Sequence, residues 1–420
     1  MNSTAWDSSY EWRAVLILSL AFGLVGIDRF VLPPLFPTMM GDLHLNYQDL
    51  GNLVGVLGVA WGASAILVGN LSDRLGRRRV LVPAVVLFSL LSVLSGFATG
   101  LVSLLVIRAV MGLAEGPVAS TGVAVAVEAS HPRRRGMNNG FFQCTIALFG
   151  IGLAPILATQ LLKFTSWRAV FWIVGTPGLI VALIMAFIVR EPPFLAATRA
   201  DAPKRPPLSA MFKHRNVPLS MIALLCAMTG VFVLSAVMPN YLVDYLKLTQ
   251  PQMGFVTSAI GFGGSLGQLG LLTLSDFIGR RTATLLSFAV AAVFLWVFIH
   301  TGASLPALFA LLWIAAMFNF GALAILAGPI PAEAAPLGFI ASVAGIVIGA
   351  GEIFGGGIAP SLAGTIAQHL GIQYTLYFAL GGQIAGLAIS AFLHETAPRK
   401  SSNARRGTVS ELDKVPEPTP

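Results

Sequence analysis

Charged residues are scarce in this chain. Only 10% of its 420 residues are Asp, Glu, Lys or Arg, whereas 56% are hydrophobic and the mean hydropathy is +0.81. Soluble globular proteins carry about 25% charged residues, so this chain has too few to cover a surface that faces water. The shortage argues against a disordered chain and a soluble enzyme, and it indicates a polytopic membrane protein.

Cysteine is nearly absent as well. The two cysteines, Cys144 and Cys226, lie in apolar segments, and the sequence has no Cys-x-x-Cys motif or His/Cys cluster. We therefore expect neither a disulfide framework nor a metal site, and no cofactor other than a coupling proton. The net charge of +8 comes from short basic clusters between apolar runs, so we expect no nucleic-acid partner.

Long apolar runs dominate what is present. A membrane-spanning helix needs roughly 20 mainly apolar residues, and the chain contains about twelve such runs in two sets of six. They cover residues 14–38, 50–70, 79–100, 102–127, 137–161, 169–190, 219–243, 253–274, 282–301, 304–328, 338–364 and 372–394. The sequence predicts an all-α polytopic membrane protein with twelve transmembrane helices in two pseudo-symmetric six-helix bundles, embedded in a lipid bilayer.

The two sets of runs define the expected domains. We expect an N-terminal bundle over 1–190, a polar, proline-rich cytoplasmic linker over 191–218, a C-terminal bundle over 219–394 and a disordered cytoplasmic tail over 395–420.

Basic residues predict the orientation, because lysine and arginine favour cytoplasmic loops. The linker and the loops after the second, fourth and eighth runs are rich in them, whereas the loops on the other side hold only Lys163, Arg168 and Lys247. We expect a multi-pass protein of the plasma (inner) membrane with both termini in the cytoplasm.

The sequence also contains an internal repeat. Leu-Ser-Asp-x-x-Gly-Arg-Arg occurs at 71–78 and again at 274–281, with Asp73 and Asp276 separated by 203 residues, close to half the chain. Duplicated halves that rock around a site at the membrane midplane are the architecture of secondary transporters.

The first copy, read as Gly-x-Leu-x-Asp-Arg-x-Gly-Arg-Arg, resembles the signature loop of the major facilitator superfamily. The resemblance covers essentially residues 12–394 and implies twelve helices, alternating access and a loop that latches the cytoplasmic side of the outward-open state. A glycine at position 76 also permits a turn with positive φ. The expected gating-loop residues are Gly69, Asp73, Arg74, Gly76, Arg77, Arg78, Asp276, Gly279, Arg280 and Arg281.

Five ionisable residues fall inside the apolar runs, where charge is costly and marks candidate functional sites: Asp28, Arg29, Arg108, Glu115 and Glu352. Asp28 and Arg29 are adjacent, so their side chains point about 100° apart. Arg108 and Glu115 are seven residues apart, so they share one helix face at about 10 Å, too far for a direct ion pair.

Four of these residues, all but Arg108, leave an alternative open. Asp28 and Arg29 could instead fix the first helix to the fourth or fifth helix. Glu115 could be a permanently neutral, hydrogen-bonded acid. Glu352 could be a second acid in the cavity or could bind backbone groups at a helix end. A guanidinium that faces an aqueous cavity suits carboxylate recognition, because its donors match two oxygens.

A second, narrower resemblance rests on Asp-Arg in the first helix and Arg-x6-Glu in the fourth. This combination resembles the anion:cation symporter branch of the superfamily, and the segment Trp167–Phe171 resembles its Trp-Arg-x-x-Phe motif. The resemblance implies that Asp28 and Glu115 couple protons, while Arg29 and Arg108 contact substrate or relay the coupling.

Further polar residues in the apolar runs are expected to line the cavity with Glu352: Gln143, Asn240, Tyr241 and Asn319. Each of these four could instead make hydrogen bonds between helices.

The leading hypothesis is a monomeric importer of a small organic anion, such as a monocarboxylate, an aromatic acid or a sugar acid, in symport with protons by alternating access. The alternative is a proton-driven exporter of drugs or other small molecules, but residues 150–157 lack the Gly-Pro-x-x-Gly-Gly pattern of such exporters. A membrane enzyme or a sensor is disfavoured, because the sequence has no catalytic constellation, no phosphate-binding loop and no soluble output domain.

Overall fold

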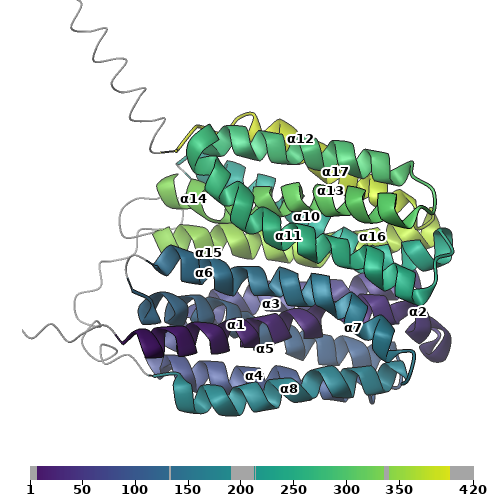
Figure 1. Cartoon of the computed structure of the whole chain (residues 1–420), viewed down its shortest axis with the longest axis horizontal. Helices are drawn as coiled ribbons and strands as arrows, with labels where there is room; N and C mark the ends of the chain where they lie inside the picture. Colours follow the sequence, from purple (N-terminus) through teal and green to yellow (C-terminus); the bar gives the residue numbers. More distant parts are fainter. Residues whose placement is uncertain (1–6, 132–133, 191–211, 213, 335–339, 398–420) are drawn as a thin grey trace, which may run out of the picture.

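The computed structural model describes residues 7–131, 134–190, 212, 214–334 and 340–397. Within these ranges the chain is helical and has no strand, and its helices form two bundles side by side (Figure 1). The predicted linker and tail lie largely outside the described residues.

The first bundle holds the helices before residue 190. They are α1 (Ser8–Phe30), α2 (Leu32–Leu43), α3 (Tyr47–Leu75), α4 (Arg77–Ser95), α5 (Leu101–Ala129), α6 (Arg135–Thr145), η1 (Ile146–Leu153), α7 (Ala154–Leu161) and α8 (Trp167–Ile188).

The second bundle repeats this arrangement. Its helices are α10 (Asn216–Asn240), η3 (Tyr241–Tyr245), α11 (Gln250–Ile278), α12 (Arg280–Ile299), α13 (Leu305–Ala327), α14 (Pro329–Ala334), α15 (Ile340–Gly351), η4 (Glu352–Ile358), α16 (Ala359–His369) and α17 (Tyr374–Ser390). Ten of the segments are long and apolar enough to cross a membrane, and α3 and the 17-residue α17 occupy the other two places. The expected fold of twelve helices is confirmed.

Three of the predicted continuous helices are interrupted. The run 14–38 divides at Val31 into α1 and α2, because Pro33 and Pro34 follow and cannot donate backbone hydrogen bonds to the preceding turn. The π-helices η1 and η4 interrupt the runs 137–161 and 338–364. Such π-helical turns are frequent at functional sites. The described parts of these three runs are therefore helical but contain an interruption.

Small residues let the two bundles approach closely. On α3, a Cβ atom added at Gly51 would lie 2.4 Å from the carbonyl oxygen of Pro360, and one at Gly58 would lie 2.3 Å from that of Gly356. On the other side of the molecule, Gly261 of α11 meets the backbone of Gly152 in η1. Close helix packing through glycine is common in membranes.

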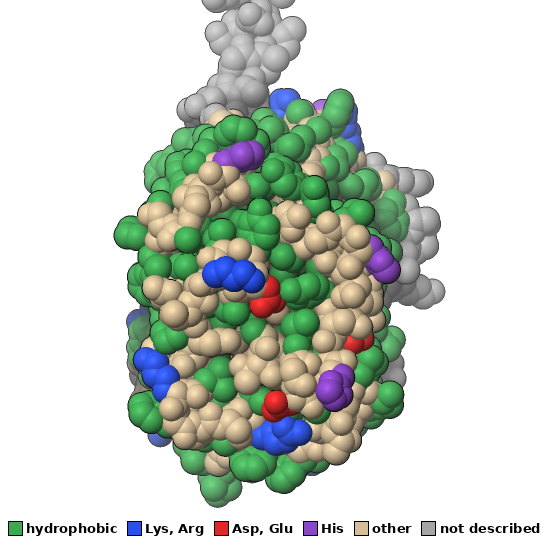
Figure 2. Space-filling model, turned by 90° about the vertical axis from the view of Figure 1, so that its right-hand side faces the viewer, with side chains coloured by type: hydrophobic (Ala, Val, Ile, Leu, Met, Phe, Trp, Pro, Cys, Tyr) green, Lys and Arg blue, Asp and Glu red, His purple; other side chains and the backbone are tan. Residues whose placement is uncertain are grey.

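The two ends of the molecule differ. The repeated loops lie at the end where the grey trace begins, on the left of Figure 1, and the first and last described residues lie there too. Figure 2 shows the opposite end, where charged side chains are few and some basic ones lie beside acidic ones. At that opposite end polar contacts join the halves: the Tyr47 hydroxyl donates to Asp244 at 2.8 Å, and the Tyr47 backbone N–H to Gln368 at 3.2 Å. The halves are thus closed at the end away from the repeated loops.

Candidate substrate site and gating loops

Arg29 and Glu352 join the two bundles near the middle of the molecule. Arg29 lies in the last turn of α1 and Glu352 begins η4, and the Nη2 atom of Arg29 lies 2.9 Å from Oε2 of Glu352. Both side chains are buried, with residue exposures of 5% and 6%. The sequence indicated both residues but gave no sign that they pair with each other.

Aromatic rings from three helices surround the Arg29 guanidinium. Its Cζ atom lies 4.5 Å from the ring centre of Phe232 on α10, 5.4 Å from that of Trp61 on α3 and 5.6 Å from that of Phe30 on α1. The faces of aromatic rings attract cations. The charge of Arg29 is therefore stabilised by one carboxylate and by rings from both halves.

Asp28 faces away from Arg29 into the first bundle. Its Oδ1 atom accepts a hydrogen bond of 2.6 Å from the hydroxyl of Ser92 on α4. The adjacent side chains Asp28 and Arg29 thus serve different partners, in keeping with the expected divergence of neighbouring positions on a helix.

Arg108 on α5 reaches the same turn of α1. Its Nη1 atom donates to the backbone oxygen of Asp28 at 3.0 Å, while Nε and Nη2 have no hydrogen-bond partner among the described residues. The Phe171 ring lies 5.9 Å from Cζ of Arg108. Arg108 is therefore a buried cation with unused donors, the arrangement expected of a group that receives a ligand.

Glu115 lies two turns further along α5. It is 0% exposed, and neither carboxylate oxygen has a hydrogen-bond partner among the described residues. Its carboxyl group interacts electrostatically with the charges of Arg29, Asp28, Arg108 and Glu352. The four residues of the predicted charge pattern and Glu352 therefore form one cluster at the centre of the molecule.

A small pocket connects the two arginines. Its volume is about 10 Å³, which is room for about one water molecule. Apart from Arg29 and Arg108, its lining is apolar: Phe30, Leu32, Pro33, Leu53, Val54, Leu57 and Ala236. The structure therefore holds the centre closed around two cationic side chains.

The other predicted cavity residues lie elsewhere. Gln143 is half-buried on α6, and Asn240 donates to Asp244 near the closed end. Tyr241 is buried and stacks on Tyr245. Asn319 lines a separate small cavity in the second bundle with Gln383. The structure does not bring these four residues to the arginine pocket.

The first copy of the repeated loop turns at Gly76, whose φ of 110° confirms the expected positive φ. Arg77 binds the hydroxyl of Ser72 at 2.8 Å and pairs with Glu128 at 2.9 Å. Arg78 is exposed. Gly69, Asp73 and Arg74 belong to the last turns of α3, and the surroundings of these three residues lie outside the described part of the structure.

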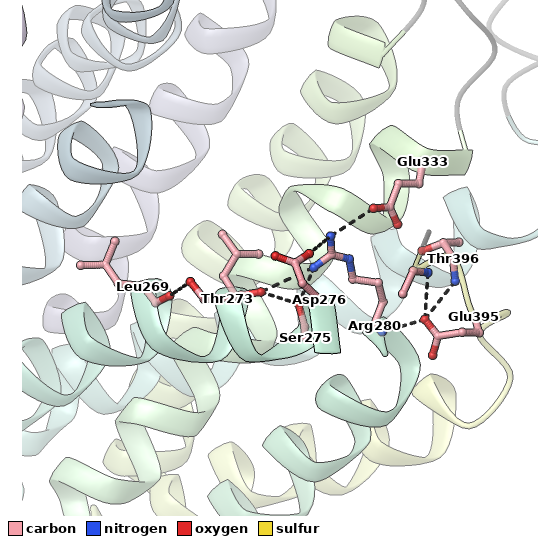
Figure 3. Close-up of polar contacts among 10 residues, drawn as sticks. Leu269, Thr273, Ser275, Asp276, Arg280, Glu333, Glu395 and Thr396 are labelled. Atoms are coloured by element: carbon pink, nitrogen blue, oxygen red, sulfur yellow. Dashed lines mark hydrogen bonds and ion pairs between the residues drawn. The ribbon is translucent and has the colours of Figure 1, made fainter. Parts of the chain in front are cut away.

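The second copy makes similar contacts, which are drawn in Figure 3. Gly279 has a φ of 101°, and Arg280 contacts Ser275 and pairs with Asp276 and, at 3.2 Å, with Glu333. Arg281 donates to the carbonyl of Ala391 at 2.6 Å. The arginine that follows each of these glycines therefore binds the serine of its own motif and a glutamate of the same half, which lies at the end of α5 or in α14.

The family comparison decides the identity of the chain. The model of the Major Facilitator Superfamily matches residues 18–239 and again residues 220–416. The chain belongs to this superfamily. It is a membrane transporter, and the two matches correspond to its two halves.

Two relatives from bacteria match most of this transporter. The chain is 32% identical to a protein named "Probable 4-methylmuconolactone transporter" from Cupriavidus pinatubonensis, over 80% of each chain. It is 28% identical to a hexuronate transporter of Bacillus subtilis, over 64% of this chain and 65% of the relative. Both relatives are named as transporters of small organic molecules.

Among solved structures, this superfamily member resembles a bacterial homolog of the human lysosomal transporter Spinster. The TM-score is 0.74 at 17% identity, covering 93% of this chain and 97% of the other. The likeness shows that the two proteins share the fold.

The sequence did not reveal three residues around the central charges. Ser92, Trp61 and Phe232 lie in apolar runs in which serine and aromatic residues are common. Their only signal would have been a contact between distant helices, which one sequence does not contain.

Proposed function

We propose that this transporter carries a small monocarboxylate with a flat or compact apolar body, in symport with protons. The observation that carries the proposal is the central pocket, where Arg29 and Arg108 are the cationic groups in an otherwise apolar lining. Arginine binds carboxylates through two parallel donors, and two donor nitrogens of Arg108 have no partner among the described residues.

The lining favours a ring acid over a sugar acid. A sugar acid carries several hydroxyl groups, and each would lose its hydrogen bonds to water against Leu53, Val54 and Leu57. An aromatic or lactone ring would instead pack against these side chains and against Phe30. The relative named for 4-methylmuconolactone supports this choice, whereas the hexuronate relative makes sugar acids the comparison to test.

Asp28 and Glu115 are the proposed proton-coupling residues. Both are buried beside the arginines, and neither carboxylate oxygen of Glu115 has a hydrogen-bond partner among the described residues. A proton on these carboxyl groups removes negative charge from the site and so favours an incoming anion.

The pocket is too small for any such substrate in this closed arrangement, so binding requires the halves to part. We propose alternating access, with the contacts around Tyr47 closing one side and the loops at Gly76 and Gly279 acting on the other. The distribution of basic residues supports a cytoplasmic position of the loops. We further propose that the protein acts in the plasma membrane as a monomer that imports its substrate.

A binding panel tests this proposal. Purified protein is titrated with benzoate, with benzamide as its neutral match, and with glucuronate as a sugar acid, and thermal stability is recorded. We expect stabilisation by benzoate and little by benzamide or glucuronate. Equal stabilisation by benzoate and benzamide would contradict recognition of the carboxylate, and a preference for glucuronate would contradict the apolar site.

A further inference from the structure

A role in packing alone does not explain the buried ion pair between Arg29 and Glu352. A buried ion pair gains little over a well-packed apolar pair, because both charges lose their hydration. Here the pair also lies between two bundles that must move apart for a substrate to enter. Its two partners come from opposite halves, α1 and η4, so separating the halves also separates the charges.

Arg29 already pairs with a carboxylate, and a carboxylate is also the substrate group that it is proposed to bind. The Glu352 carboxylate occupies Nη2 of Arg29 at 2.9 Å, and the same guanidinium lines the central pocket with Arg108. A substrate carboxylate that approaches Arg29 therefore competes with a carboxylate of the protein itself.

We propose that Glu352 holds the place of the substrate carboxylate on Arg29 in the empty carrier, and that substrate binding exchanges one carboxylate for the other. The inference rests on the proposed transport of organic anions and adds a third carboxyl group to it. Glu352 then determines specificity, because only a ligand with an anionic group replaces it at no loss of charge pairing.

The exchange has a consequence for protons. Once Arg29 binds the substrate, Glu352 loses its counter-ion inside the protein, and an unpaired buried charge is costly. Uptake of a proton by the Glu352 carboxylate neutralises it. Among the described residues, Arg29 from α1 is its ion-pair partner, and Glu115 from α5 interacts with it electrostatically.

Two described neighbours of Glu352 on other helices carry no titratable group. They are Gly62 on α3, whose added Cβ would lie 3.3 Å from that of Glu352, and Phe232 on α10, which borders Gly356 one turn along η4. Arg29 is therefore the one cation in direct contact with Glu352 among the described residues.

The exchange also loosens the contact between the halves. While Glu352 holds Arg29, an ion pair spans the two bundles near their centre. When a substrate carboxylate replaces Glu352 on Arg29, the ion pair between the two bundles is lost. Arg29 then contacts a bound ligand that is carried along when the halves move. Binding and rocking are coupled in this way through one side chain.

Glu352→Gln tests the exchange directly. Benzoate is the probe, and its Kd is measured for the wild type, for Glu352→Gln, for Glu352→Asp, which keeps the carboxylate, and for Asp7→Asn. Asp7 pairs with Arg190 at an exposed position outside the site, so this variant controls for the loss of one negative charge. We expect roughly tenfold tighter binding by Glu352→Gln, because no internal carboxylate competes, and near-wild-type binding by the other two.

A second measurement does not depend on that variant. Proton uptake during benzoate binding is followed in weakly buffered solution, in a background of Asp28→Asn and Glu115→Gln. Uptake that persists there and disappears when Glu352→Gln is added supports the exchange. Absence of proton uptake in this background, or unchanged or weaker benzoate binding by Glu352→Gln, would overturn it while leaving the proposed function intact. A wild type that binds no carboxylate would overturn the proposed function itself.

Discussion

Arg108 donates to the backbone carbonyl of Asp28 and not to its carboxylate. The hydrogen bond measures 3.0 Å, while the Asp28 carboxylate accepts from Ser92 at 2.6 Å. The carbonyl lies in the last turn of α1, where backbone acceptors lack some of their helical donors. The backbone of the broken first helix thus holds Arg108, while two of its donor nitrogens make no hydrogen bond to the described residues.

Arg108 is expected to bind the carboxylate of the substrate. Arg108→Ala should weaken benzoate binding by about 1.5–3 kcal/mol, a roughly tenfold to hundredfold loss, because a charge-assisted hydrogen bond disappears. Arg108→Lys keeps the charge but not the planar fork, so its loss should be smaller but clear. Isothermal titration measures both, with Arg190→Lys at an exposed position as the control. Unchanged affinity in the folded Arg108→Ala protein would refute this role.

Glu115 is expected to carry a coupling proton. Glu115→Gln keeps the shape of the side chain but cannot exchange a proton. The variant should therefore retain exchange of labelled for unlabelled substrate across a vesicle membrane while losing accumulation driven by a pH gradient. Asp7→Asn, which removes a carboxylate outside the site, should behave as wild type in both assays. Undiminished accumulation by Glu115→Gln would mean that Glu115 has no part in coupling.

The glycine contacts on α3 are expected to hold one end of the molecule closed. Gly51→Ala places a methyl group 2.4 Å from the Pro360 carbonyl, so α3 and α16 must move apart. A short bifunctional thiol reagent that links Gln48→Cys to Ser361→Cys should react much less in this variant. Gly41→Ala is the matched control, since nothing lies within 4 Å of its added Cβ. Equal cross-linking in both variants would contradict the role of this seam.

Orientation in the membrane is tested by single cysteines at the two ends. Lys247 and Arg281 are exposed, whereas the native Cys144 and Cys226 are buried and give little background. An impermeant thiol reagent should label Lys247→Cys in intact cells and Arg281→Cys only after permeabilisation. The reverse pattern would place the repeated loops outside the cell.

The fold could be predicted from the sequence because helices that span a bilayer need long apolar runs, and because basic residues are concentrated in every second loop. It also indicated the central residues, since charge inside such runs is rare. The pairing of Arg29 with Glu352 was not predictable, because these positions are 323 residues apart and meet only across the interface of the bundles. The break at Val31 could have been foreseen from Pro33 and Pro34.

A single sequence does not show which polar residues line a cavity, as four of the predicted residues illustrate. Gln143, Asn240, Tyr241 and Asn319 resemble one another as polar positions in apolar helices, yet none of them lines the arginine pocket. Asn240 holds Asp244 near the closed end, and Asn319 shares a cavity with Gln383. A polar residue in a membrane helix can make a hydrogen bond between helices or bind a ligand, and only its position in the structure distinguishes these two roles.

Uptake by proteoliposomes tests the central claim most directly. Vesicles containing the wild-type protein and protein-free vesicles are given labelled benzoate with an acidic outside, with equal pH on both sides, or with an acidic outside and a protonophore. Neutral benzoic acid crosses a bilayer unaided, so proton symport predicts accumulation above that of protein-free vesicles only in the first condition, and loss of this excess in Arg108→Ala vesicles. Accumulation no greater than in protein-free vesicles in the first condition would contradict proton-coupled transport of an organic anion by this protein.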